Sequence, residues 1–305
     1  MPKKPFSSAK PKSSSPDRKY QVNEEAELLS FLITHLNQGR NSIKSLLARG
    51  QVFVGERAET KYNYLLKPGQ VVTIRKEGTA ETVPLAGLVI LHEDDDLIIV
   101  NKDSGLLSIA SDKEADLTAY RQLTAHVRVN DPKSRIFVVH RLDRDTSGVM
   151  MFAKSEAVQQ KLQTNWQEIV KERSYVALVE GTVKKNEGTI KSWLKETSTL
   201  RMYSSERPND GQLAVTHYKL LQAGRQFSLL EVHLETGRKN QIRVHMEDIG
   251  HPVVGDKKYG SKTKPIPRLG LHARVLAFEH PSSGKLMRFD TGIPKLFNSP
   301  FKGEK

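Results

Sequence analysis

The 305-residue sequence contains no cysteine, which excludes disulfide bonds, cysteine nucleophiles and thiolate metal sites. Its apolar runs are far shorter than the roughly 20 residues that a membrane-spanning helix needs. No apolar stretch follows the opening Met-Pro-Lys-Lys-Pro, as it would in a secretion signal. The phosphate-binding patterns G-x-G-x-x-G and G-x-x-x-x-G-K-[ST] do not occur either. We therefore expect a cytoplasmic protein that has no membrane contact and binds no nucleotide cofactor.

The charge of the chain is strongly positive. Forty-eight Lys and Arg residues against 35 Asp and Glu give a net charge of +13 and an isoelectric point near 9.7. A globular protein this basic usually binds a polyanion, and nucleic acid is the first candidate. The alternative at this point is a basic protein whose charges are only solvated.

Composition divides the chain into three parts. Residues 1–20 hold five Ser, four Pro and six Lys or Arg, a mixture that buries too little apolar surface to fold and predicts a disordered basic arm. A small module is expected over 21–80. A larger domain is expected over 84–300, where β-branched apolar runs begin.

The module at 21–80 reads as a small α/β unit with a basic surface. Apolar residues recur at helical spacing over 28–36, and a second short helix carries Arg40 and Lys44 on the side away from its apolar residues. Short strands are expected at 51–54 and 71–74. This pattern resembles the alpha-L RNA-binding module of a small-subunit ribosomal protein and of several RNA-modifying enzymes. The resemblance implies RNA binding by Arg40 and Lys44.

The larger part has many strand-like runs and few helices, without regular β-α-β alternation. This pattern predicts an α+β fold: a large mixed, mostly antiparallel sheet with flanking helices. Helices are expected at 114–128, 155–170 and 238–249. Strands are expected at 88–91, 97–100, 136–139, 149–153, 175–179, 227–234 and 271–278.

The run His-Arg-Leu-Asp-Arg-Asp-Thr-Ser-Gly at 140–148 carries the strongest chemical signal. It lies on a turn between two strand-like segments and places Asp143 between Arg141 and Arg144. Nearby positive charge favours the ionised carboxylate. Asp143 is therefore a candidate nucleophile in an electropositive pocket.

Two other interpretations of this run fit poorly. Its carboxylates have the spacing of a calcium loop, but the twelfth position, which should be a bidentate Glu, is Lys154. A triad of His140, Asp143 and Ser147 would come from one short segment instead of separate ones, and no G-x-S-x-G elbow is present.

Together with five other segments, this run closely resembles the RluA-type pseudouridine synthases of the large-subunit ribosomal RNA class. Residues 140–148 match the aspartate motif, 171–181 the tyrosine motif and 236–244 the arginine motif. Accessory pieces agree in the same order: 101–107, 250–260 and 271–273. The resemblance implies the pseudouridine synthase fold.

The resemblance also implies roles for individual residues. Asp143 is the nucleophile, and it attacks the anomeric carbon of the sugar, attacks the base, or abstracts a sugar proton. Arg243 pairs with it and keeps it ionised, and Tyr175 stacks on the target base. The implied substrate contacts are Arg141, Arg144, Leu271 and Lys102. One departure concerns Asn240, where the family commonly has a histidine; an amide can form hydrogen bonds but cannot carry a proton.

We therefore expect an enzyme that isomerises specific uridines to pseudouridine in RNA, without cofactor or metal. Large-subunit ribosomal RNA is the first candidate substrate, and a monomer is expected. The alternatives are the same isomerase acting on tRNA, and a non-catalytic RNA-binding factor in ribosome assembly.

Overall fold

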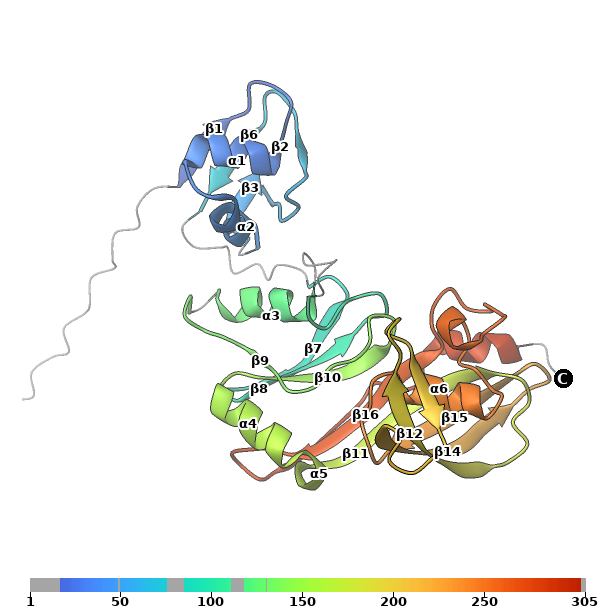
Figure 1. Ribbon diagram of the computed structural model, residues 1–305. Helices are drawn as coiled ribbons and strands as arrows, with labels where there is room; N and C mark the ends of the chain where they lie inside the picture. The colour runs from blue at the N-terminus through green and yellow to red at the C-terminus, as the bar shows by residue number, and fades with distance from the viewer. Residues whose placement is uncertain (1–16, 49, 76–84, 111–117, 130, 303–305) are drawn as a thin grey trace, which may run out of the picture. The chain divides into compact units, whose positions relative to one another are not determined.

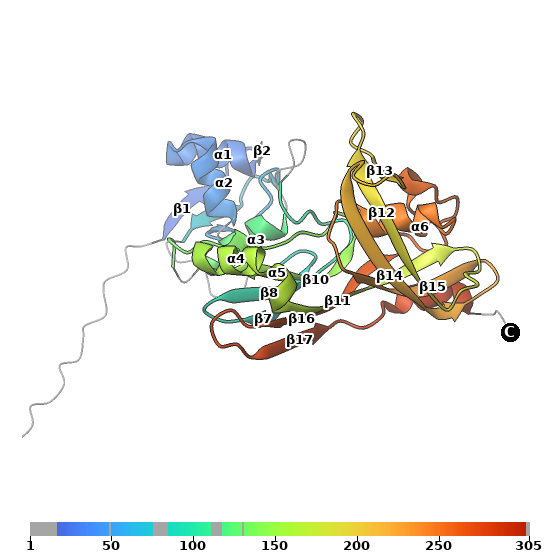
Figure 2. The same cartoon turned by 60° about the horizontal axis from the view of Figure 1, so that its bottom comes forward.

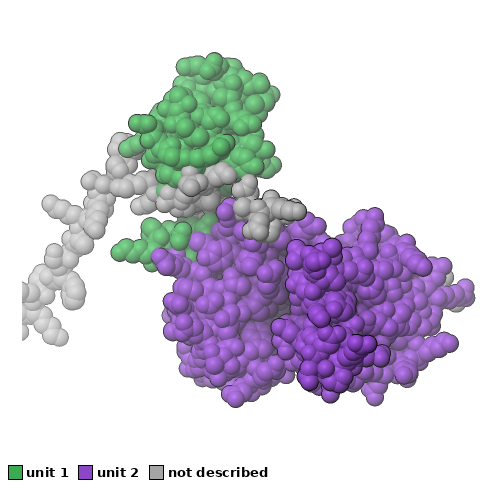
Figure 3. Space-filling model, in the orientation of Figure 1, with its two compact units in different colours: residues 1–84, 125–133 green, residues 85–124, 134–305 purple. Residues whose placement is uncertain are grey.

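The structure is a computed structural model that describes residues 17–48, 50–75, 85–110, 118–129 and 131–302. It comprises two compact units, one of residues 1–84 with 125–133 and one of residues 85–124 with 134–305 (Figure 3). No helix in these described ranges is long and apolar enough to cross a membrane.

The smaller unit contains a four-stranded sheet in the order β1-β6-β3-β4, two helices and the short pair β2-β5. Apolar residues of both helices form one core with residues of β3 and β6. Because β1 begins at Arg18 and pairs with β6, the ordered unit starts before the predicted boundary at residue 21, while residues 1–16 lie outside the described part. The elements are β1 (Arg18–Gln21), β2 (Ala26–Glu27), α1 (Leu28–Leu36), α2 (Arg40–Ala48), β3 (Val52–Val54), β4 (Arg57–Ala58), β5 (Leu65–Leu66) and β6 (Val71–Ile74).

The larger unit is dominated by one eleven-stranded sheet in the order β13-β12-β14-β15-β11-β16-β10-β8-β7, with β17 beside β16 and β9 beside β10 (Figure 1). Neighbouring strands run antiparallel, except that β10 and β16 are parallel. The predicted α+β class with a mixed, mostly antiparallel sheet is confirmed.

The strands of this unit are β7 (Leu88–Glu93), β8 (Leu97–Lys102), β9 (Phe137–Val138), β10 (Ser147–Ala153), β11 (Val170–Glu180), β12 (Glu187–Glu196), β13 (Met202–Ser205), β14 (Gln212–Ala223), β15 (Phe227–Leu234), β16 (Leu271–Glu279) and β17 (Leu286–Asp290). Its helices are α3 (Ala119–Val127), whose residues from 125 on are counted with the smaller unit, α4 (Glu156–Thr164), α5 (Trp166–Ile169), α6 (Gln241–Asp248), and the 3-10 turns η1 (Lys257–Tyr259) and η2 (Lys295–Phe301). Figure 2 shows α4 and α5 beside β10 and β11, and α6 beside β13 and β14.

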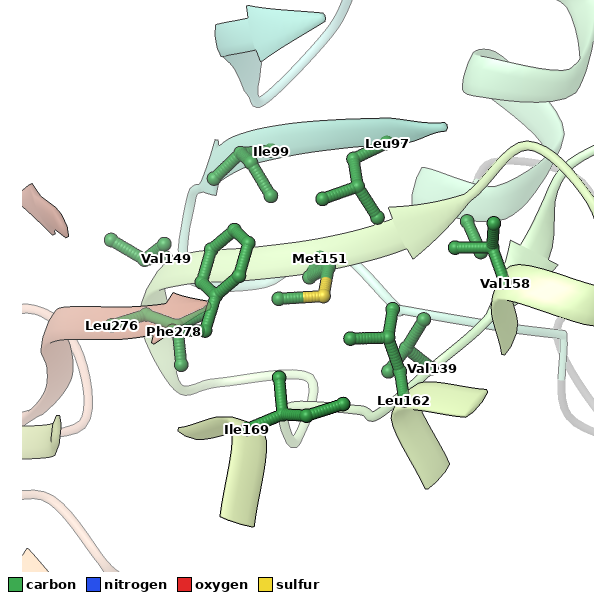
Figure 4. Close-up of a cluster of buried hydrophobic side chains, with 11 residues drawn as sticks. Leu97, Ile99, Val139, Val149, Met151, Val158, Leu162, Ile169, Leu276 and Phe278 are labelled. Atoms are coloured by element: carbon green, nitrogen blue, oxygen red, sulfur yellow. The ribbon is translucent and has the colours of Figure 1, made fainter. Parts of the chain in front are cut away.

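Helices α4 and α5 pack against the β8-β10-β16 part of the sheet through a buried apolar cluster (Figure 4). Ile99 from β8, Met151 from β10 and Phe278 from β16 are each fully buried, and Leu162 of α4 packs among them. Burying a side chain of this size stabilises the fold by about 1.5–3 kcal/mol. The cluster makes this half of the sheet a rigid base for the loop that leads into β10.

The parallel contact between β10 and β16 depends on Gly148. Gly148 pairs with Ala273 and has φ 121°. A Cβ atom at this position would lie 2.0 Å from the carbonyl oxygen of Ala273, closer than atoms can approach. Only glycine combines this φ with so close an approach of two backbones.

Candidate active site

Asp143 lies in the loop that enters β10, and the segment after β8 holds this loop in place. The hydroxyl of Ser108 donates a hydrogen bond to the carbonyl of Leu142 at 2.7 Å. The N–H of Gly105 donates to the carbonyl of Arg144 at 2.9 Å. These bonds attach the loop on both sides of Asp143 and fix the direction of its side chain.

Lys102 at the end of β8 also binds this loop through hydrogen bonds. Its side chain is fully buried, and its Nζ donates to the carbonyl oxygens of Asp103, Leu106 and Arg144 at 3.0, 2.7 and 3.0 Å. Burial lowers the pKa of Lys102 to about 8. The predicted RNA contact of Lys102 is wrong, because the ammonium group has no exposed surface and its three donors are already used.

Arg243 lies in the first turn of α6 and joins two carboxylates. Its Nε and Nη2 donate to the two oxygens of Asp256 at 2.6 and 2.8 Å, and its Nη1 donates to Oδ2 of Asp143 at 3.2 Å. Burial opposes the charge of the guanidinium, but the hydrogen bonds and negative charge of Asp256, together with Asp143, raise the pKa of Arg243. Arg243 is therefore a fixed cation beside the Asp143 carboxylate.

Asn240 gives Asp143 a second hydrogen-bond donor. It caps α6 with φ 53°, a left-handed conformation that Asn tolerates better than most residues. Its Nδ2 donates to Oδ2 of Asp143 at 2.6 Å. The hydroxyl of Tyr259 accepts the N–H of Met202 at 3.2 Å and donates to Oδ1 of Asn240 at 3.0 Å. This arrangement turns the amide nitrogen of Asn240 toward Asp143.

The Asp143 carboxylate opens into a pocket of about 360 Å³. Buried walls come from Tyr175 on β11 and Leu271 at the start of β16, and the exposed Arg141 stands at its rim. Burial raises the pKa of Tyr175, and the charge of Asp143 acts in the same direction, although Arg173 opposes it. The phenol is therefore protonated at neutral pH. In this neutral form it presents a flat apolar ring with a polar hydroxyl at its end.

Five of the predicted site residues thus meet at one pocket: Asp143, Tyr175, Arg243, Arg141 and Leu271. The other predicted contacts lie elsewhere. Arg144 is exposed outside the pocket lining and pairs with Asp145 at 3.3 Å. Arg40 is exposed at the start of α2 in the smaller unit, and the side chain of Lys44 on α2 is outside the described part.

The pocket offers a carboxylate, a guanidinium, an amide, a phenol and an aliphatic wall. Such a set suits a nucleobase and its sugar, since it combines stacking surface with few directed polar groups. Across the residues that the structure describes, no three His, Asp or Glu side chains are grouped so that they could hold a metal ion.

Comparison with known proteins agrees with this geometry. Residues 96–248 match the family model described as RNA pseudouridylate synthase. The chain is 35% identical to the uncharacterized RNA pseudouridine synthase YlyB of Bacillus subtilis, over 86% of this chain and 88% of that protein. The chain belongs to the RNA pseudouridine synthase family.

Other members of the family give the same result. Ribosomal large subunit pseudouridine synthase D of Vibrio cholerae is 34% identical over 84% of this chain and 83% of its own length. The solved structure of human RNA pseudouridylate synthase domain containing 1 superposes with a TM-score of 0.56 at 27% identity, covering 70% of this chain and 86% of that one. The protein is therefore an RNA pseudouridine synthase, and the predicted family and enzyme class are confirmed.

Two residues of this synthase site were not singled out from the sequence: Asp256 and Tyr259. Both lie in the run at 250–260, which was noted only as an accessory match. Asp256 is the one acidic residue of that run, and an acidic side chain there is a signal of a buried ion pair. Its partner, Arg243, could not be identified without the fold.

Proposed function

We propose that this synthase isomerises uridine in large-subunit ribosomal RNA, with Asp143 as the reacting carboxylate. In the overall reaction, the bond between the sugar and N1 of uracil breaks and a bond between the sugar and C5 forms. The C5 proton leaves and N1 regains one, so no oxidant or other reagent is consumed. The enzyme must hold the detached base while it turns.

The observation that carries this proposal is the position of the Asp143 carboxylate inside the pocket, where it is held by Arg243 and Asn240. Both donors bind the same oxygen, Oδ2. The other oxygen, Oδ1, has no hydrogen bond with the described residues and is available to react with the substrate. Tyr175 and Leu271 then supply the walls between which the base stacks.

Ribosomal RNA is proposed as the substrate because relatives named ribosomal large subunit pseudouridine synthase D, from Vibrio cholerae and Haemophilus influenzae, are 34% and 33% identical to this chain. The positive charge of the chain supports binding to an extended RNA. The smaller unit, with the exposed Arg40, is proposed as an additional RNA-binding module.

The test compares two neighbouring carboxylates. Asp143→Asn should abolish the release of tritium from C5-labelled uridine in ribosomal RNA while RNA binding persists. Asp145→Asn is the matched control: its side chain is about half exposed, outside the pocket lining, and it should retain turnover. Normal turnover by Asp143→Asn would refute the assignment of the reacting carboxylate.

The substrate is tested by mapping pseudouridines in ribosomal RNA and tRNA from cells with and without the gene. Sites lost only from large-subunit ribosomal RNA support the proposal, whereas sites lost only from tRNA would replace it with the tRNA isomerase. No lost site in either pool, with no activity of the purified protein, would favour the non-catalytic assembly factor.

A further inference from the structure

A second hollow of about 240 Å³ lies next to the active-site pocket, and the proposed reaction gives it no role. It is formed where the loop before Asp143 meets α4, α5 and the start of β11. We call it the Trp166 pocket. Its lining includes His140, Gln163, Trp166, Gln167, Arg173 and Gly237.

The Trp166 pocket and the active-site pocket are adjacent. Gly237 lines both of them. Arg173 of the one and Tyr175 of the other are two residues apart on β11, so their side chains leave the same face of the strand from Cα atoms about 7 Å apart. This is the spacing of neighbouring nucleotides in an unstacked RNA strand.

Gly237 lies at the border of the two pockets, close to the guanidinium of Arg173. A Cβ atom at this position would lie 3.0 Å from Nη1 and 3.3 Å from Nη2 of Arg173. A side chain at this position would therefore require the guanidinium of Arg173 to shift by a few tenths of an ångström. The Nη2 of Arg173 donates to the carbonyl of Thr236 at 3.0 Å, which holds the guanidinium at the border of the two pockets.

The lining of the Trp166 pocket is suited to an unpaired base. The partly buried indole of Trp166 packs against His140 with ring centroids 5.1 Å apart, and the guanidinium of Arg173 lies 5.8 Å from the indole centroid. Aromatic rings and guanidinium planes are the surfaces on which proteins stack single-stranded bases.

Two glutamines add hydrogen-bond acceptors at the edge of this surface. Nε2 of Gln163 donates to the carbonyls of Val138 and Val139, and Nε2 of Gln167 donates to the carbonyl of Glu235. Both amide nitrogens thus donate to backbone carbonyls, and each Oε1 can accept a hydrogen bond. Every nucleobase has at least one N–H group on its Watson–Crick edge, so any base could satisfy such an acceptor.

We propose that the Trp166 pocket binds the base of a nucleotide adjacent to the target uridine, stacked on Trp166. The identity of that nucleotide rests on the proposed function, since it is defined by the uridine bound beside Asp143. Occupation of both pockets would draw two successive bases out of the RNA stack. The second base would then anchor the strand while the first one is detached from its sugar.

Two matched variants each leave a single tryptophan, so that the fluorescence of Trp166 and of Trp193 can be measured separately. Trp193→Phe leaves Trp166 as the only tryptophan, and Trp166→Phe leaves Trp193 on β12. We expect saturable quenching of fluorescence by hexaadenylate in Trp193→Phe and little change in Trp166→Phe. A sugar-phosphate hexamer without bases carries the same charge and should not quench. Equal quenching by this hexamer, or no saturable quenching by hexaadenylate, would overturn the proposal.

Affinity supplies a second measurement. Trp166→Leu should weaken the binding of hexaadenylate about tenfold, the order expected for one lost stacking contact, while Trp166→Phe should stay close to wild type. Circular dichroism establishes that both variants are folded; a folded Trp166→Leu with unchanged affinity would refute stacking.

The outcomes also separate the two proposals. Quenching without any pseudouridine formation would support base binding in the Trp166 pocket and refute the proposed function. Pseudouridine formation without quenching would support the proposed function and refute base binding in the Trp166 pocket.

Discussion

Asp256→Asn tests whether Arg243 is held for catalysis by a buried ion pair. The Asp256 side chain is 1% exposed and binds Nε and Nη2 of Arg243 with both of its oxygens, whereas Arg243 reaches Asp143 through Nη1 alone. Asparagine has nearly the same shape but lacks the charge and one of the two acceptors. The substitution therefore removes half of the bidentate contact without opening a cavity.

The expected effect is large because Arg243 is buried. Removing one partner of a buried ion pair costs about 3–5 kcal/mol, and the retained amide oxygen places Asp256→Asn near the lower end, at about 3 kcal/mol of the free energy of unfolding. A guanidinium released from its fork also shifts relative to Asp143. A displacement of about 1 Å in a catalytic group lowers turnover roughly a hundredfold.

The assay measures urea-induced unfolding and single-turnover pseudouridine formation for the same preparations. Asp290→Asn is the control, because Asp290 forms the same bidentate contact with Arg274 at a partly exposed site, where both side chains are 26% exposed and Arg288 and the N–H of Gly292 also bind the carboxylate. A pair of this kind contributes at most about 1 kcal/mol. Equal losses of stability in the two variants, or wild-type turnover by Asp256→Asn, would refute the reasoning.

Three further substitutions or conditions test other parts of the structure. Tyr259→Phe removes the hydroxyl that orients Asn240. It should lower kcat about fivefold with unchanged RNA affinity, because one hydrogen bond contributes about 1 kcal/mol. An unchanged kcat would mean that Asp143 alone orients the amide. Gly148→Ala should cost about 4 kcal/mol or more and abolish soluble expression, whereas Gly39→Ala, with open space around it and no positive φ, should express normally. As the pH drops from about 6.5 toward 4, the free energy of unfolding should fall by up to about 1.4 kcal/mol per pH unit for each buried histidine. Burial keeps these side chains neutral in the folded protein, whereas in the unfolded chain they take up protons. A flat urea-unfolding profile over this range would contradict the folded-state pKa values of about 3, 4 and 4 for His140, His245 and His272.

The sequence located the strands that are buried on both faces. The run at 227–234 matches β15 at both ends, and all seven residues of β10 are buried, including the predicted 149–153. Such strands are continuous apolar runs and can be recognised without knowing their partners. The helix expected at 155–170 exists as α4 and α5, which are separated at Asn165.

The strands β12 and β14 were not predicted. Their exposed and buried residues are mixed, with Lys191 and Lys195 on the exposed side of β12. In such strands the apolar residues are too scattered to form a run, and the pairing with neighbours decides the conformation. The predicted strand at 136–139 is limited to the two residues of β9 for a similar reason, since only these pair with β10.

The chemical groups of the site were encoded locally. The run at 140–148 singled out Asp143 as a candidate and, together with the other motifs, indicated the family, because it combines a carboxylate with arginines in an order that packing alone does not require. Arg243 and Tyr175 followed from the resemblance of two other short motifs. For these residues, type and order along the chain were enough to predict a role.

The partners of these groups depended on the folded chain. Asp143 and Arg243 are 100 residues apart and meet only because α6 follows β15 beside the loop before β10. Lys102 reads as a surface cation, yet it is buried under the Asp143 loop on three carbonyl oxygens. Short-range patterns carry the chemistry of a side chain, whereas its burial and its hydrogen-bond partners are set by strands that pair across long stretches of sequence.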